Sequence, residues 1–515
     1  MGGGQMPRRP KAKNTLTAGE RVALYEAERE KRQREGAAED SLASFTKSEN
    51  AEKPSFRERK ALAKPQSALV SVDFSVSVGK VSAMHGMCNG PVSYGADLSE
   101  MFREIGVPCV RFDCTDSALS ACAVDLSRIF KNPDADPALS ENYDFSYTDR
   151  YVEAARKSGA EIIFRLGESP DPLLSGKKVE IPEDLDRLAL VCVNVIKHYN
   201  DGWAGGYSLG IDRFEIWSHD SSLDGRECLR EFELYRRVAS AITIYDGTLR
   251  VGGMGFDGLD TACREFVRYC AKNRVRLDFL TLSCFGADPR EMGEQLRTAM
   301  AYVRNCGLSD TEIVVAKWGY LDVEALEGQP ASRVLAGGGE RMVGLRRKLF
   351  EAQASVKGAA YVGAFMLEAE GIPGVNAACF FDAQPLMSPW CAIADRLGRP
   401  QKPYYAFKAF GEIFRAGNGT VCECVEQQGY RHSGVYAKAA ISDSGECYVM
   451  LSSFDGCGTV DLRLDGIPGS VCSAELYLLD GVKDLASGEC IPISGMKKRM
   501  VLSLGEYSIA LIKLF

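Results

Sequence analysis

The chain lacks the residue patterns that bind metal ions or dinucleotides. It has 4 histidines in 515 residues, and its 18 cysteines include no Cys-x-x-Cys pair. Zinc sites need such clustered ligands, so we expect no metal. No Gly-x-Gly-x-x-Gly follows an early strand, which removes the usual support for a doubly wound open sheet. Nothing in the sequence asks for a cofactor, and we expect none.

Long apolar runs and a strong positive charge are also lacking. No run reaches the roughly 18 to 20 apolar residues that span a bilayer, so we expect no membrane span. The net charge of −8 argues against a nucleic-acid partner. Basic residues near the start precede no apolar core, so we expect no secretory signal, a cytoplasmic protein and reduced thiols.

The first part of the chain, residues 1–66, differs in composition from the rest. Lys and Arg outnumber Asp and Glu there, and few apolar residues are present to be buried. A segment that buries little cannot offset the entropy of ordering its backbone. We therefore predict a flexible charged tail.

Eight short apolar runs follow, and stretches with helical periodicity separate them. Buried parallel strands that alternate with helices are typical of a (β/α)8 TIM barrel, which we predict for residues 83–416. The runs are VSAMHGM near His85, PCVRFD ending at Asp113, EIIFRLGE ending at Glu168, RFEIWS ending at Ser218, RVGGMGF near Gly253, LDFLTLSCF ending at Phe285, EIVVAKWGY ending at Tyr320 and AACFFDAQ ending at Gln384.

The pattern changes in the last hundred residues. Short, alternating, turn-separated runs such as TVDLRLDG and SAELYLLD predict an all-β sandwich over residues 417–515. An alternating strand at residues 67–82 precedes the barrel. We expect this strand to join the sandwich and so bring the two ends of the fold together.

Polar side chains and indole rings gather at the predicted strand ends. The active sites of such barrels lie at the C-terminal ends of the strands. Hydroxyl groups of a sugar need donors and acceptors, and its ring faces stack on indoles, although a Trp at a strand end often serves only as core packing. The candidate ligand-binding residues are Arg111, Asp113, Glu168, Trp217, Ser218, Asp220, Trp318 and Asp382.

Residues from about Lys80 to Phe414 resemble a known family. The resemblance rests on segments in unbroken order, among them VPCVRFD, VCVNVIKHYNDGWAGGYSLGIDRFEIW, TEIVVAKWGY and FFDAQPLMSPWCAIAD. They are similar to glycoside hydrolase family 39, the group of β-xylosidases and α-L-iduronidases. The resemblance implies a barrel with a β-sandwich, retaining cleavage of O-glycosyl bonds, and a carbohydrate ligand of pentoside or uronide type.

The same resemblance places the catalytic positions on unexpected residues. The acid/base Glu of the family stands two residues after the Trp of the fourth strand, which is His219 here. The nucleophilic Glu precedes the Trp of the seventh strand, which is Lys317 here. Retaining cleavage needs two carboxyl groups about 5 Å apart. Our leading hypothesis is therefore a catalytically degenerate, family-39-like protein that binds a carbohydrate or a partner.

Other interpretations stay open at this point. An atypical glycosidase could use the carboxylates of Glu168, Asp113, Asp220 or Asp382, and His219 could donate a proton. Lys317 could form a Schiff base, or pair with Asp220, Glu168 or Asp382 and fill the former catalytic hole. A purely structural protein would have a filled rim, and the chain could also form a homo-oligomer.

Overall fold

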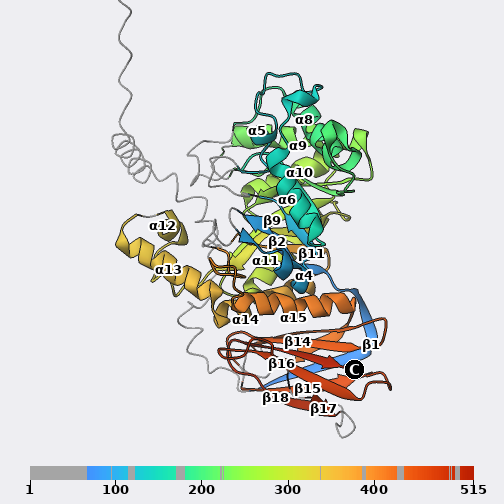
Figure 1. The fold of residues 1–515 in the computed structure, drawn as a ribbon, viewed down its shortest axis with the longest axis vertical. Helices are drawn as coiled ribbons and strands as arrows, with labels where there is room; N and C mark the ends of the chain where they lie inside the picture. Colours follow the sequence, from blue (N-terminus) through green and yellow to red (C-terminus); the bar gives the residue numbers. More distant parts are fainter. Residues whose placement is uncertain are drawn as a thin grey trace, which may run out of the picture.

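The structure is a computed structural model that describes residues 67–93, 96–113, 122–169, 180–220, 223, 225–336, 338–384, 390–425, 434–456, 458–486, 488, 490–492 and 499–515. The tail predicted for residues 1–66 lies outside these ranges. Within them the chain forms a closed barrel and a separate sheet (Figure 1). No helix in the described ranges is long and apolar enough to cross a membrane.

The barrel is the predicted (β/α)8 barrel. Its eight strands follow one another around the ring, and the eighth pairs with the first in parallel register. Each strand contains one of the eight apolar runs, because strands covered by helices must be apolar on both faces. The strands are β2 (Ala83–Cys88), β5 (Cys109–Arg111), β6 (Glu161–Leu166), β7 (Arg213–Ile216), β8 (Arg250–Phe256), β9 (Phe279–Gly286), β10 (Glu312–Tyr320) and β11 (Val375–Phe380).

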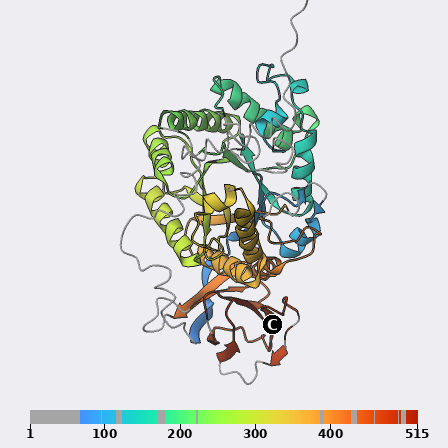
Figure 2. The same cartoon turned by 90° about the vertical axis from the view of Figure 1, so that its left-hand side faces the viewer.

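Helices surround this barrel, and Figure 2 shows them as a ring seen down the barrel axis. Their ends follow local sequence signals. Asp184 caps α8 by accepting a hydrogen bond from the Arg187 N–H, and the helix ends at Gly202, whose φ of 72° favours glycine. The ring consists of α4 (Ser99–Ile105), α6 (Ser146–Lys157), α8 (Leu185–Asp201), α9 (Gly225–Tyr245), α10 (Thr261–Asn273), α11 (Pro289–Asn305), α14 (Val356–Glu370) and α15 (Lys402–Ala416).

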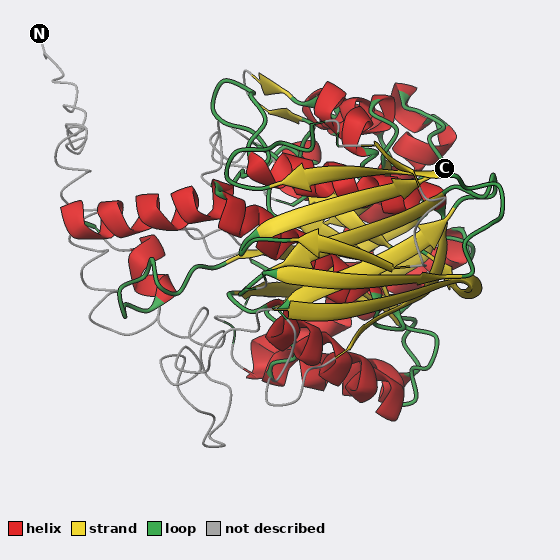
Figure 3. Cartoon of the chain, turned by 90° about the horizontal axis from the view of Figure 1, so that it is seen from below, coloured by secondary structure: helices red, strands yellow, loops and turns green. Residues whose placement is uncertain are grey.

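Smaller elements lie in the loops. After β10 the chain inserts two helices, α12 (Ala331–Ala336) and α13 (Glu340–Ala354), before α14 begins. We call these two helices the arm. The arm projects away from the barrel in Figures 1 and 3 and stands in front of the ring in Figure 2. The remaining elements are β3 (Val92–Ser93), β4 (Ala96–Asp97), α5 (Leu126–Ile129) and the 3-10 turns Ser140–Asn142 and Trp203–Gly205.

The C-terminal domain is the predicted all-β sandwich, built as one nine-stranded sheet that curls on itself. Val70 and Leu462 from one half share a core with Leu451 and Ile512 from the other. β1 lies between β12, its antiparallel neighbour, and β15, its parallel neighbour. In spatial order the strands are β17 (Cys490–Pro492), β16 (Ser473–Leu479), β19 (Ser508–Leu514), β14 (Cys447–Ser453), β13 (Val435–Ile441), β12 (Asn418–Val425), β1 (Ser67–Lys80), β15 (Thr459–Asp465) and β18 (Arg499–Ser503).

The sheet packs against the two helices that precede it, α14 and α15 (Figure 1). The Ser452 hydroxyl donates to the Ala360 carbonyl at 2.8 Å, and Lys513 pairs with Glu412 at 2.7 Å. Gly363 of α14 faces Ser452 and Ile509, and an added methyl group would lie 2.8 Å from Ile509 Cδ1. The close approach of α14 to the sheet therefore depends on a glycine, and it fixes the sheet on the side of the barrel formed by these two helices.

Candidate functional site

The nucleophile position suggested by the family resemblance carries an ion pair. Lys317 lies within β10, and its Nζ is 2.7 Å from Asp113 Oδ2, just beyond the end of β5. The Lys317 side chain is 28 % exposed, whereas Asp113 is buried. The ammonium therefore stands at the surface of the rim with its counter-ion beneath it. Asp113 was not among the partners that the sequence suggested for Lys317.

Asp113 is held by two arginines as well. Its Oδ1 lies 3.3 Å from Arg111 Nη1 and 4.0 Å from Arg165 Nε. Burial raises the pKa of Asp113, but the three cations outweigh burial and hold the pKa well below its usual range. The Asp113 carboxylate is thus ionised at any physiological pH. The positive charges of Lys317, Arg111 and Arg165 balance its negative charge.

The same network continues into the barrel. Arg111 Nε donates to Glu215 Oε2 at 2.6 Å, and Arg165 Nη2 donates to Asp125 Oδ1 at 2.6 Å. Arg111 Nη2, Glu215 Oε1 and Ser218 Oγ are buried without a hydrogen-bond partner. All three atoms lie 3.6–3.8 Å from the position that a Cβ atom would take on Gly255. Gly255 of β8 therefore faces three polar atoms that come from the C-terminal ends of β5 and β7.

The acid/base position carries a second buried pair. His219 follows β7, and its Nδ1 lies 2.6 Å from Glu231 Oε2 on α9. Burial lowers the pKa of His219, but the hydrogen bond and charge of Glu231 outweigh it, so the pKa is raised. Burial also raises the pKa of Glu231. Each group of the pair thus binds its proton more tightly than it does in water, and Glu231 orients the imidazole ring.

Two other rim carboxyls have raised pKa values. Glu168, after β6, accepts hydrogen bonds from the Ser127 N–H at 2.7 Å and from its hydroxyl at 2.6 Å. Burial and the negative charge of Asp125 raise the pKa of Glu168 to about 7. Burial raises the pKa of Asp257, after β8, to about 6, although Lys317 lowers it in part. Both carboxyls can exchange a proton near neutral pH.

The two tryptophans next to the catalytic positions are buried. Trp217 is 2 % exposed and has a φ of 65°, and its backbone N–H donates to the Leu166 carbonyl. Trp318 is fully buried and stacks on Phe365 of α14 with ring centroids 4.3 Å apart. Their rings are core packing between strands and helices, which is the alternative that the sequence left open.

The remaining candidates also have definite places. Asp220 is half-buried, and its N–H lies 3.4 Å from Glu231 Oε1. Asp382 follows β11, is fully buried and accepts a hydrogen bond from Gln384 Nε2 at 3.1 Å. His85 lies in β2, where burial lowers its pKa to about 3 and its Nε2 contacts the Gly106 carbonyl. Among the described residues, no cluster of His, Cys, Asp or Glu could hold a metal ion.

Sequence reasoning missed five charged residues of this site, which are Asp125, Arg165, Glu215, Glu231 and Asp257. Arg165 lies within β6, and Asp125 directly precedes α5. Asp257 directly follows a predicted strand, so the strand-end rule could have found it. Glu231 lies in a helix and Glu215 within a strand, and neither position differs in sequence from an ordinary core or surface residue. Only the fold brings them to His219 and Arg111.

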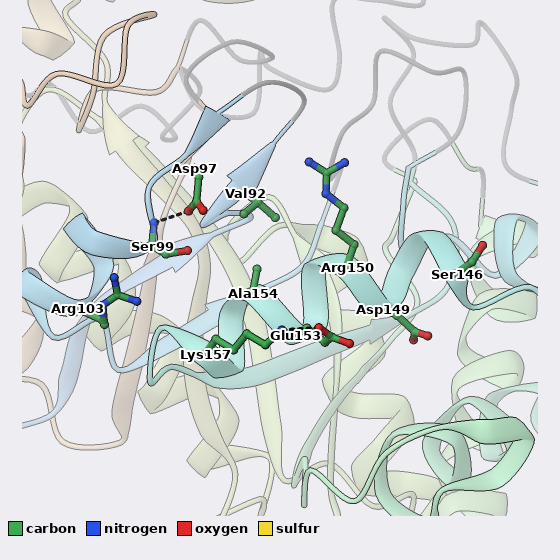
Figure 4. Close-up of a pocket in the computed structure, with 10 residues that line it drawn as sticks. All are labelled: Val92, Asp97, Ser99, Arg103, Ser146, Asp149, Arg150, Glu153, Ala154 and Lys157. Carbon is green, nitrogen blue, oxygen red and sulfur yellow. Dashed lines mark hydrogen bonds and ion pairs between the residues drawn. The ribbon is translucent and has the colours of Figure 1, made fainter.

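A concave site lies on the flank of the barrel, and none of the rim candidates lines it (Figure 4). It has a volume of about 600 Å³ and is bordered by α4, α6 and the β3–β4 hairpin. Several of its charged groups already have partners: Asp97 accepts from the Ser99 N–H at 2.8 Å, and Lys157 pairs with Glu153 at 2.6 Å. These contacts are typical of a solvated helix surface.

The sequence and the fold are similar to those of known glycosidases. The sequence model of glycosyl hydrolases family 39 matches residues 121–300. This part of the chain is thus similar to glycosyl hydrolases family 39. A beta-xylosidase from Geobacillus stearothermophilus is 23 % identical over 249 residues, which are 41 % of this chain and 49 % of that protein. The chain thus aligns with about half the length of this curated relative.

Solved structures share the fold of this family-39 relative. A glucosidase from Croceicoccus marinus is 20 % identical with a TM-score of 0.67, covering 87 % of this chain and 98 % of that one. The GH39 enzyme from Xanthomonas axonopodis pv. citri is 13 % identical with a TM-score of 0.62, covering 90 % and 99 %. Barrel and sheet together therefore match these architectures from end to end.

Proposed function

We propose that this family-39 relative binds a carbohydrate of pentoside or uronide type at its rim and does not perform retaining hydrolysis. The observation that carries the proposal is the 2.7 Å ion pair between Lys317 and Asp113 at the nucleophile position. A retaining glycosidase attacks with a carboxylate there and stabilises a positively charged sugar in the transition state. An ammonium at that point repels the developing charge and cannot trap the sugar.

The acid/base position supports the same proposal. His219 is tied to Glu231, so its proton is shared with a buried carboxylate. An imidazolium could protonate a leaving group, but protonation alone does not replace the nucleophile. Buried donors and acceptors around Gly255, together with the half-exposed Lys317, Glu168 and Asp257, suit the binding of hydroxyl groups.

One observation favours a second candidate function, an atypical glycosidase. Glu168 has a raised pKa of about 7, whereas the pKa of Asp113 lies well below its usual range. Two rim carboxyls whose environments push their pKa values apart are the usual mark of an acid and a base. In that case Glu168 would protonate the leaving group, and Asp113, which stays ionised, would be the second, anionic carboxyl group of the pair.

The test combines turnover and binding on one set of variants. We expect wild-type protein to show no hydrolysis of aryl xylosides or aryl glucuronides, and to be stabilised against heat by one of the free sugars. The double variant His219→Glu, Lys317→Glu restores both carboxylates and should gain measurable hydrolysis. The matched control is His219→Gln, Lys317→Gln, which removes the same cations without adding carboxylates and should stay inactive.

Wild-type turnover would overturn the proposal. If that turnover is lost in Glu168→Gln and retained in Asp220→Asn, the atypical glycosidase is the correct function. A lack of heat stabilisation by any sugar would remove the binding role as well.

A further inference from the structure

Four aromatic rings form a partly exposed row at the rim, beside the arm. Phe381 and Phe285 follow or end barrel strands, Trp390 lies in the next loop, and Phe350 belongs to α13. Adjacent ring centroids are 6.2 Å apart from Phe381 to Phe285, 5.9 Å from Phe285 to Trp390, and 5.2 Å from Trp390 to Phe350. We call these four residues the aromatic wall.

The aromatic wall differs from the other large rings of the barrel. Trp217 and Trp318 are buried, whereas all four rings of the wall are in part accessible to solvent. A single half-buried ring is ordinary at a protein surface. Here four half-buried aromatic residues form one continuous row that begins beside a charged group, and such a combination of aromatic and polar side chains is typical of a binding site.

The wall begins at the candidate site. Lys317 Nζ lies 5.6 Å from the centroid of the Phe381 ring, so the first ring adjoins the nucleophile position. From there the row leads to Phe350, which the arm supplies. The arm is an insertion between β10 and α14 and stands in front of the ring of helices (Figure 2). A ligand held at Lys317 therefore meets the wall as it extends toward the arm.

A buried amide next to the wall lacks hydrogen bonds. Gln353, near the end of α13, is 1 % exposed, and neither its Oε1 nor its Nε2 has a partner. A side chain added at Gly319 would lie 3.0 Å from Gln353 Nε2 and 3.2 Å from Phe285 Cε1. The amide thus lies next to Phe285. Buried polar groups are normally paired, so this one is an unfilled donor and acceptor beside an aromatic surface.

We infer that the aromatic wall binds a second ring of the ligand, attached to the sugar that sits at Lys317. The inference rests on the proposed carbohydrate function and names the ligand class: a glycoside with two rings. The second ring presents a flat apolar face, either of a pyranose or of an aryl group, because aromatic side chains stack on such faces.

The experiment compares ligands with one ring and with two. Methyl, p-nitrophenyl and disaccharide forms of β-xylosides and β-glucuronides are titrated by calorimetry into the full chain and three variants. The variants are Trp390→Ala, the conservative Trp390→Phe, and Phe515→Ala, a matched loss of an exposed ring in the C-terminal sheet. Far-ultraviolet circular dichroism and thermal unfolding confirm that each variant is folded.

We expect at least one two-ring ligand to bind about ten-fold more tightly than its methyl glycoside. Trp390→Ala should abolish that gain and leave the methyl glycoside unchanged, Trp390→Phe should restore most of it, and Phe515→Ala should have no effect. A gain with the aryl ligand alone identifies an aromatic second ring, and a gain with the disaccharide alone identifies a sugar.

The experiment distinguishes failure of the proposed carbohydrate function from failure of the proposed role of the aromatic wall. Methyl glycosides that bind without any gain from a second ring overturn the wall and leave the carbohydrate function standing. Equal weakening of one-ring and two-ring ligands by Trp390→Ala also overturns the wall. A lack of binding by every glycoside overturns both. Wild-type hydrolysis overturns the proposed lack of catalysis, and the wall is then judged by KM for the same ligands.

Discussion

The two catalytic positions of this rim carry nitrogen where the family resemblance expects carboxylates, yet their surroundings differ. His219 pairs with Glu231 of α9, and the pKa values of both groups are raised. Lys317 pairs with Asp113, which two arginines also hold and which stays ionised. One position thus keeps the means to transfer a proton, whereas the other has become a fixed ion network.

This difference shows which half of the chemistry is harder to replace. A proton donor at a rim can be an imidazole or a carboxyl group, provided that its pKa lies near neutral. A nucleophile that traps a sugar must be an anionic carboxylate, which an ammonium cannot replace. The change at Lys317 is therefore the decisive one, and three variants test the contrast between the two positions.

The largest effect is expected for Asp113→Ala. The substitution removes the carboxylate that Arg111, Arg165 and Lys317 share, while Arg111 keeps Glu215 and Arg165 keeps Asp125. Loss of these buried ion pairs should lower the free energy of unfolding by about 3–5 kcal/mol. Urea denaturation at pH 7 measures this. Lys317→Met is the control and should cost less, because Lys317 is partly exposed and the arginines still balance Asp113. A loss below about 1 kcal/mol for Asp113→Ala would contradict the fixed ion network.

A smaller effect is expected for Glu231→Gln, of about 1–3 kcal/mol at pH 6, because the buried His219 imidazole then faces a neutral amide in place of a carboxylate. The pKa of His219 is raised in the folded protein. Its contribution is therefore present below its unfolded pKa of about 6.5 and is lost as the pH rises through the folded value. Unfolding free energies from pH 5 to 9 should show this decline in wild type and not in Glu231→Gln. An identical pH profile for both proteins would show that the pair does not hold a proton.

The smallest effect is expected for Glu168→Gln, and it concerns pH alone. The pKa of Glu168 is raised to about 7, so the folded state binds a proton more tightly than the unfolded state. Its contribution to stability is complete below about pH 4.5 and is lost as the pH rises through about 7. Glu168→Gln should remove that decline, and Asp220→Asn serves as the control. Thermal unfolding in a series of buffers measures it, and a decline that persists in Glu168→Gln would exclude this origin.

The barrel could be predicted because local signals and tertiary packing agree along its whole length. Each of the eight apolar runs became a strand, since a strand covered by helices must be apolar on both faces. The arm was less predictable. The stretch from Gly338 to Val356 has continuous helical periodicity, yet the helix ends at Ala354, and Ser355 caps α14 with its hydroxyl accepting from the Gly358 N–H.

The site could be predicted only in part. Strand ends gave Arg111, Asp113, Glu168, His219 and Lys317, because the C-terminal ends of parallel strands meet at one face. Whether Trp217 and Trp318 face a ligand or the core could not be predicted, because the sequence does not tell on which side of a strand end a ring packs. The rings that do reach solvent there include Trp390 and Phe350, and they come from a loop and an inserted helix.

The sequence by itself determined the alternation of strands and helices, the all-β end of the chain and the residue types at the strand ends. Short-range periodicity and burial decide these features, and both are written in neighbouring residues. Only the tertiary structure decided the partners: Asp113 for Lys317, Glu231 for His219 and Glu215 for Arg111. Charges find their counter-ions across space, and their pKa values depend on that pairing and on burial, which no local pattern encodes.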